Sequence, residues 1–215
     1  MTQSSRVAHA TMNRDNPFET HLALVHEGAV LPAFWMLMPA SWERAPTQVC
    51  RPIISGLTLP KVPLVAVTHF IGDPNVGTLQ RIHIRTERLA AMGASVAEVE
   101  GVAWRNLCRR PVTWEQAADG MLMCSQDFLA AEHILDPAFM ELAAATLGAR
   151  DAPLLVAIPS RTMLLAVRFG TTHHAQQQAL AKMARLGFER AGMTAITPWL
   201  FMVKSGRIVC LMEPM

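Results

Sequence analysis

The residues most able to do chemistry lie where predicted strands end and predicted helices begin. Ser125 closes the run Met121–Ser125 (MLMCS), which has the composition of a buried strand, and Asp127 and His133 follow it. A hydroxyl or thiol beside a histidine or carboxylate is the arrangement that nucleophilic catalysis needs. Ser125, Asp127 and His133 are therefore candidate catalytic residues. The alternative interpretation is structural, with Cys124 packed inside the sheet and Ser125 or Asp127 capping the next helix.

A second polar group, Ser160 and Arg161, follows the apolar run Leu154–Ile158 and Pro159. Ser160 is a further candidate nucleophile. An arginine directly after a buried strand either pairs with an acid of the fold or holds an anion, because its planar guanidinium suits both uses. The sequence favours the ion pair, although it does not identify the carboxylate. Asn106, in the middle of a predicted helix, is likewise expected to hydrogen-bond a neighbouring backbone group.

The chain has none of the sequence motifs that mark metal or nucleotide sites. It contains no H-E-x-x-H, no G-x-x-x-x-G-K-[ST], no G-x-G-x-x-G and no G-x-S-x-G. The adjacent His173 and His174 would point about 100° apart on a helix, so they do not form the usual metal-binding pair. His69 and His83 lie in two neighbouring predicted strands and could face each other, but no third ligand is evident. We therefore expect no metal and no cofactor.

The composition describes a packed protein with an unusually apolar surface. Apolar residues make up 51% of the 215 residues and charged residues only 17%, with 14 methionines, and the mean hydropathy is +0.23. So few charges favour a surface that is partly covered by a protein partner or by a second copy of the chain. The 19 basic and 17 acidic residues give a net charge of +2, which is too balanced to predict nucleic-acid binding.

The same reading predicts a cytoplasmic protein without a membrane span. The longest apolar stretch, Ala29–Trp42, is interrupted by Pro32 and Pro39 and is shorter than the roughly 20 residues that a spanning helix needs. The N-terminus has no apolar segment of the kind found in export signals. The four cysteines are scattered, as expected for reduced and mostly buried thiols (Cys50, Cys108, Cys124 and Cys210).

The predicted elements give an α+β fold, a mainly antiparallel sheet with helices packed on one face. Residues 1–17 are predicted to be a flexible tail, and residues 18–215 a single domain. Ser95 and Glu98 match a capping box at a helix start. Asp136 and Pro137 start another helix, and Thr172 is expected to cap a long one. The predicted strands form hairpins: Leu64–Ile71 with Leu79–Arg85, Leu154–Ile158 with Thr162–Phe169, and Trp199–Val203 with Arg207–Leu211.

Several short motifs between residues 60 and 212 resemble the bacterial family of uncharacterised proteins UPF0354 (DUF1444). They are Ala103-x-x-Asn106-Leu107, Ile134-Leu135, Val156-Ala157-Ile158-Pro159-x-Arg161, and Trp199-Leu200-Phe201 followed by a turn at Gly206. The resemblance implies a cytoplasmic α+β domain and no mechanism, because the family has no established activity. Where the family pattern places an aspartate after the arginine, this chain has Thr162. No catalytic residue is carried over.

Two hypotheses for the function follow. The first is a non-enzymatic binding protein that uses an apolar, methionine-rich surface to contact another protein or itself. The second is a small hydrolase or transferase with a site near Ser125, Asp127, Ser160 and Arg161, which requires these side chains to converge on one pocket. The sequence favours the first, because it contains no coherent set of acid, base and metal-binding residues.

Overall fold

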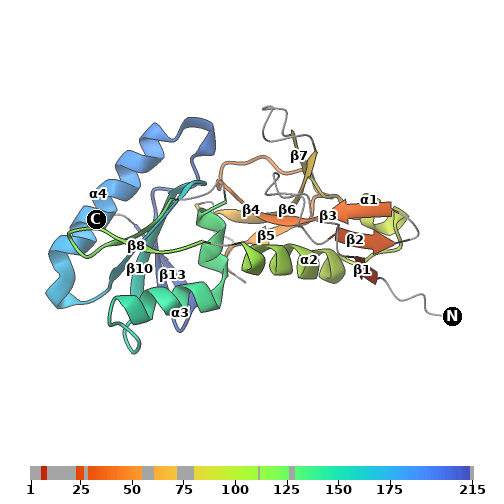
Figure 1. The fold of residues 1–215 in the computed structure, drawn as a ribbon. Coiled ribbons are helices and arrows are strands. Elements are labelled where there is room, and N and C mark those ends of the chain that lie inside the picture. Colours follow the sequence, from red (N-terminus) through yellow and green to blue (C-terminus); the bar gives the residue numbers. More distant parts are fainter. Residues whose placement is uncertain are drawn as a thin grey trace. The chain divides into compact units, whose positions relative to one another are not determined.

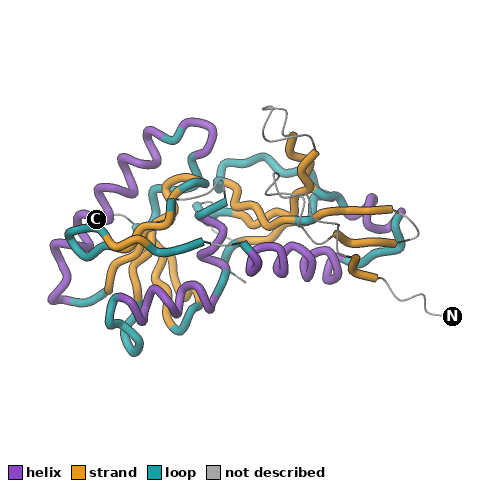
Figure 2. The backbone as a smooth tube through the Cα atoms, viewed as in Figure 1, coloured by secondary structure: helices purple, strands orange, loops and turns teal. Residues whose placement is uncertain are grey.

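The computed structural model describes residues 6–8, 23–26, 29–54, 61–71, 80–110, 112–125 and 129–213. The chain divides into two compact units (Figures 1 and 2). The first comprises residues 1–36, 43–51 and 65–110, and the second comprises 37–42, 52–64 and 111–215. The sequence predicts one domain because it shows no linker. No linker is needed to separate these units, since each is assembled from several separate segments of the chain.

Among the described residues, the first unit contains two helices and two sheets, although the strand ends Leu37, Met38, Pro52 and Leu64 of the second sheet belong to the second unit. A three-stranded sheet, with the order β1-β2-β3, contains β1 (Arg6–Ala8), β2 (Ala23–His26) and β3 (Ala29–Pro32). Strand β1 therefore falls within the stretch that the sequence predicts to be a tail. In the second sheet, β6 (Leu64–Ile71) pairs with β7, and the order is β4-β6-β5. The other elements are β4 (Phe34–Met38), β5 (Cys50–Pro52), β7 (Gln80–His83), α1 (Thr86–Ala91) and α2 (Val96–Arg109).

The β6–β7 hairpin is confirmed, and its register separates the two histidines. His83 pairs with Thr68, and His69 pairs with Ile82, so the histidines are not opposite each other. The Nδ1 atom of His83 lies 3.1 Å from the Thr68 hydroxyl. A side-chain hydrogen bond across the hairpin thus occupies one nitrogen that a metal would need.

The predicted capping box at the start of α2 is confirmed. The Glu98 backbone N–H donates to the Ser95 hydroxyl oxygen over 3.2 Å, and the Ser95 backbone N–H donates to the Glu98 carboxylate over 2.8 Å. The two bonds satisfy donors that a helix start would otherwise expose.

The second unit is built on a six-stranded antiparallel sheet with the order β13-β12-β10-β11-β9-β8 (Figure 1). The terminal hairpin and the β10–β11 hairpin are both confirmed, as is the antiparallel α+β class. The sequence predicts that the strand beginning at Leu154 stops before Pro159, but β10 continues through Pro159 to Ser160. The register of β10 with β11 shifts after Ala157. The strands are β8 (Glu115–Gln116), β9 (Leu122–Cys124), β10 (Leu154–Ser160), β11 (Met163–Arg168), β12 (Leu200–Lys204) and β13 (Arg207–Met212).

In this unit the helices cover both faces of the sheet, and not one face as the sequence predicts. The long helix α4 (His174–Arg190) packs on the face that carries Leu155 and Ala157. Helix α3 (Pro137–Thr146) shares a pocket with Leu154 and Val203, whose side chains belong to the opposite face. The sequence pattern shows that β10 is buried on both sides, but it does not say which elements cover each side.

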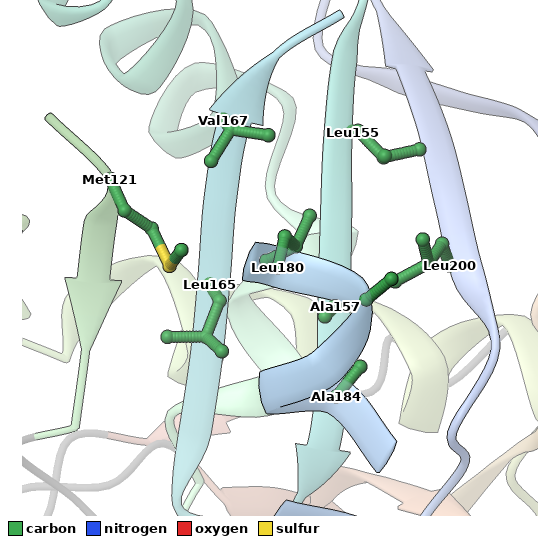
Figure 3. Packing of buried hydrophobic residues seen from close by; sticks show 9 residues of the cluster. Met121, Leu155, Ala157, Leu165, Val167, Leu180, Ala184 and Leu200 are labelled. Carbon is green, nitrogen blue, oxygen red and sulfur yellow. The ribbon is translucent and has the colours of Figure 1, made fainter. Parts of the chain in front are cut away.

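The core between α4 and the sheet is made of complementary small and large side chains (Figure 3). Leu180 and Ala184, one turn apart on α4, face strands β10 and β11, and both side chains are fully buried. The remaining buried members of this cluster are Met121, Leu155, Ala157, Leu165, Val167, Ala181 and Leu200. This packing holds α4 in place above the strand ends that carry the polar candidates.

Helix α4 begins differently from the prediction. Thr171–His173 forms a 3₁₀ turn before it, and the residue at the N-cap position is His173, which makes no side-chain capping bond. Thr172 therefore does not cap the helix. The amide of Gln177 donates to the Gly170 carbonyl just before the helix, over 2.5 Å, and the amide of Gln176 donates to the Asp119 carbonyl over 2.6 Å, which joins the helix start to the segment before β9.

Asp136 caps α3 as predicted, and its removal has a measurable cost. Its carboxylate accepts hydrogen bonds from the backbone N–H groups of Ala138 and Phe139, over 3.0 and 3.3 Å. We expect Asp136→Ala to lower the free energy of unfolding by about 1 kcal/mol, because the cap bonds are lost. Asp136→Asn, which keeps a capping oxygen, should remain close to wild type in urea denaturation. Equal losses in the two variants would contradict the capping role.

Candidate functional site

Arg161 lies in the tight turn between β10 and β11, and its backbone is bonded on both sides. Its N–H donates to the Thr194 carbonyl over 2.9 Å, and its carbonyl accepts from the Ala131 N–H over 3.1 Å. Thr194 belongs to the 3₁₀ turn Gly192–Thr194, and Ala131 begins the 3₁₀ helix η2 (Ala131–Leu135). The turn is thus held between two other segments, which explains how a long charged residue keeps a fixed place inside the unit.

The Arg161 side chain is buried and pairs with Glu132. Only 1% of Arg161 and none of Glu132 is exposed, and the Nη1–Oε1 distance is 3.6 Å. The same Glu132 oxygen accepts a hydrogen bond from the Leu37 N–H over 2.9 Å, and Arg161 Nη2 lies 4.0 Å from the Met38 sulfur. Glu132 is therefore the carboxylate that the sequence analysis left unidentified. This arrangement joins the β10–β11 turn, η2 and residues 37–38.

His133 is buried in an aromatic cluster and lies away from solvent. Its ring is 5.2 Å from that of Phe139, and 1% of the residue is exposed. The Trp114 ring stacks on the same Phe139 ring, with a distance of 4.8 Å between the ring centroids. The Trp114 indole N–H also donates to the Phe139 carbonyl. A histidine in these surroundings has the environment of a core residue.

Of the other catalytic candidates outside η2, the structure describes Ser125 and Ser160. Ser125 is exposed and lines neither of the two pockets described below. Asp127 lies outside the described residues. Ser160 is largely buried, and its hydroxyl lies 3.2 Å from that of Thr162. Its neighbour is thus a second hydroxyl and not a base that could activate it.

Asn106 contributes a buried hydrogen bond within the first unit. Its side-chain amide donates to the Ala33 carbonyl over 2.8 Å, and the residue is 1% exposed. Asn106 thus fastens α2 to the segment that leads into β4. This is a contact between a helix side chain and a backbone group distant in sequence, so it has a structural role.

Ser160 and Thr162 do line a groove, which lies between the β10–β11 turn and the C-terminal half of α4. The groove has a volume of about 490 Å³, within the range of ligand sites. Three larger apolar side chains, those of Met163, Met183 and Leu186, form much of its wall. The sequence points to the serine but not to the groove, because the two sides of the groove come from segments about 25 residues apart.

One stripe of α4 faces this groove. Met183, Leu186, Gly187 and Arg190 recur at the i, i+3, i+4 and i+7 spacing of a single helix face, and all four line the groove. This stripe is separate from the core stripe of Leu180 and Ala184. Met183 remains 38% exposed, although its spacing in the sequence is that of a core residue.

Gly187 allows α4 to approach the sheet closely at the base of the groove. A Cβ atom at this position would lie 3.0 Å from the Pro159 Cβ and 3.1 Å from its Cγ. This is tighter than an ordinary van der Waals contact. The glycine therefore lets Pro159 pack against the helix, and the groove is shaped by a fixed backbone contact in addition to its flexible side chains.

Helix α4 carries more basic than acidic side chains, and an exposed methionine lies next to the groove. Lys182, Arg185 and Arg190 are exposed on α4, as is the acidic Glu189. Of these, Arg190 lines the groove. Met193, which lies between the groove residues Ala191 and Thr194, is 96% exposed.

A second pocket of about 440 Å³ lies between α3 and the β12–β13 turn. Its walls combine the small side chains of Ala144 and Ala145 with Leu142, which is 54% exposed, and with Glu141 and Arg150. Charges of both signs lie here, and Met140 is its one methionine. This pocket therefore fits the predicted methionine-rich surface less well than the groove does.

Among the residues that the structure describes, no three His, Cys, Asp or Glu side chains are grouped so that they could hold a metal ion. Within the same residues, no helix has both the length and the apolar character needed to cross a bilayer. Comparison with protein-family models, with curated proteins and with solved structures found no match to this chain.

Proposed function

We propose that this protein is a non-enzymatic binding protein, and that the groove beside α4 holds an apolar, acidic segment of a partner protein. The observation that carries the proposal is the stripe of Met183, Leu186 and Arg190 that lines the groove along one face of α4, with Met183 and Arg190 exposed. Methionine side chains are flexible and polarisable, so a surface made of them adapts to different apolar partners. The resemblance to UPF0354 adds no activity to this proposal.

The charge of α4 supports an acidic partner segment. Three exposed cations and one exposed anion on this helix would attract carboxylates, and Arg190 lies at the groove itself. Its guanidinium can donate two hydrogen bonds to a carboxylate in a bidentate contact. The apolar wall would then supply affinity and Arg190 would set the orientation of the bound segment.

Selection from a library of displayed 12-residue peptides tests this function. We expect the selected peptides to combine Leu, Ile, Phe or Met with Asp or Glu, and to bind the purified protein in fluorescence anisotropy. Met183→Lys should weaken their binding by about tenfold or more, because it places a charge on the groove wall. Leu142→Lys is the matched control, since it introduces the same charge at an exposed apolar position of the other pocket. It should leave the affinity unchanged.

The failure of the proposal would be equally clear. If no peptide were enriched, or if Met183→Lys and Leu142→Lys had the same effect on affinity, the groove would not be the binding site. The hydrolase or transferase alternative near Ser125, Asp127, Ser160 and Arg161 gains no specific support, because Arg161 pairs with Glu132 and the hydroxyl next to Ser160 belongs to Thr162.

A further inference from the structure

Strand β13 lies at one end of the six-stranded sheet and carries apolar side chains that its own unit covers only in part. Within the described residues no strand lies beyond it. Five successive apolar residues, Ile208 to Met212, follow Arg207, and none of them is fully buried. Val209 is 50% exposed. In β10, by contrast, all seven residues are buried.

The two edge strands of this sheet, β8 and β13, differ in length and polarity, and this difference affects how readily each could pair with a strand of another chain. Strand β8, at the other end, has only the two exposed polar residues Glu115 and Gln116, and such a short polar strand does not favour pairing with another chain. Strand β13 has six residues and contains neither lysine nor proline. Its register with β12 shifts once, between Met202 and Val203, and is regular from Cys210 to Met212. A bulge of this kind opposes pairing at that point of the strand.

The charges at the two ends of β13 favour pairing with a second copy. Arg207 is exposed at the beginning of the strand, and Glu213 is exposed directly after its end. If two β13 strands pair antiparallel about a twofold axis, the Arg207 end of each lies beside the Glu213 end of the other. Opposite charges then meet at both ends, and apolar side chains meet between them. A parallel pair would instead bring like charges together.

We propose that two copies of this chain associate by antiparallel pairing of their β13 strands, which joins the two six-stranded sheets. The outward-pointing backbone N–H and C=O groups of the strand supply the hydrogen bonds, and the half-exposed apolar side chains supply buried area. One pair of strands forms a small interface, so we expect a dimer that dissociates in the micromolar range. The interface is separate from the groove beside α4 and does not depend on the proposed function.

Sedimentation velocity of the full-length chain over a range of concentrations tests the proposal. We expect a concentration-dependent dimer in the wild type and a monomer in Val209→Lys, whose new charge lies on an already exposed position and leaves the fold intact by circular dichroism. Met183→Lys is the matched control for the groove, and its dimerisation should equal that of the wild type.

Charge reversal at the strand ends then distinguishes antiparallel pairing from any other contact. Arg207→Glu and Glu213→Lys, each alone, should weaken dimerisation by about tenfold, because each places like charges at both ends of the paired strands. The double variant Arg207→Glu/Glu213→Lys restores the opposite charges and should recover the wild-type dissociation constant. A strictly monomeric wild type would overturn the proposal, as would a dimer that Val209→Lys leaves intact. A dimer that is lost in Met183→Lys would also overturn it and would assign the interface to the groove.

Discussion

Glu132→Leu is expected to lower the free energy of unfolding by about 3–5 kcal/mol, because it leaves the Arg161 guanidinium buried without this carboxylate. The substitution also removes the acceptor of the Leu37 N–H, which lies 2.9 Å from Glu132 Oε1. Urea denaturation followed by circular dichroism measures the loss. The effect is large because only 1% of Arg161 is exposed, so the charge cannot turn to solvent when its partner is removed.

Two further variants separate the charge from the hydrogen bond. Glu132→Gln keeps an oxygen that can accept from Leu37 but removes the negative charge, so we expect it to remain clearly destabilised. Adding Arg161→Met to Glu132→Gln removes the buried cation as well and should recover most of the lost stability, since apolar replacements of a buried pair are often nearly neutral. If the two substitutions were simply additive, the charges would not be coupled, and the ion pair would not be what holds this turn in place.

Gly206→Ala is expected to destabilise the second unit by about 2–5 kcal/mol, the sum of a backbone cost and a steric cost. Gly206 has φ +67° in the turn that joins β12 and β13, beside Ser205 with φ 48°. A Cβ at Gly206 would lie 2.5 Å from the Pro137 carbonyl oxygen and 2.9 Å from the Pro137 Cα. These are backbone atoms at the first turn of α3, so the helix itself would have to move.

Gly148→Ala provides the control that isolates the steric part. Gly148 has a similar φ of +62°, but nothing lies within 4 Å of the position that a Cβ would take. It should therefore show the conformational cost alone, about 1–2 kcal/mol. The difference between the two variants in urea denaturation measures the contact between the β12–β13 turn and α3. Equal losses would mean that this contact contributes nothing to stability.

Local signals in the sequence are sufficient for the elements that depend on neighbouring residues. The Ser95–Glu98 capping box, the Asp136 cap and the β6–β7 and β12–β13 hairpins each require residues that lie within a few positions of one another. Such features are determined by side-chain hydrogen bonds and turn conformations that a short segment forms by itself. At Thr172 the capping signal is weaker: the sequence predicts the long helix α4 but not the residue at which it begins.

The candidate site shows what the sequence leaves open. The types of residue at Ser160 and Arg161 indicate a nucleophile and an ion pair, but their partners depend on which segments pack beside the β10–β11 turn. Glu132 reaches Arg161 because η2 lies beside the β10–β11 turn, and Met183 and Ser160 line one groove because α4 packs on the sheet. Neither fact follows from spacing along the chain.

The sequence by itself therefore determined the antiparallel α+β class, the hairpins, the caps and the apolar, methionine-rich character of the protein. The tertiary structure alone decided which residues are accessible: it buried Arg161 and His133 and left Met183 and Val209 exposed. The physical reason is that hydrophobic burial is not directional, so composition fixes how much apolar surface exists, and only the packing of helices on sheets decides which part of it faces solvent.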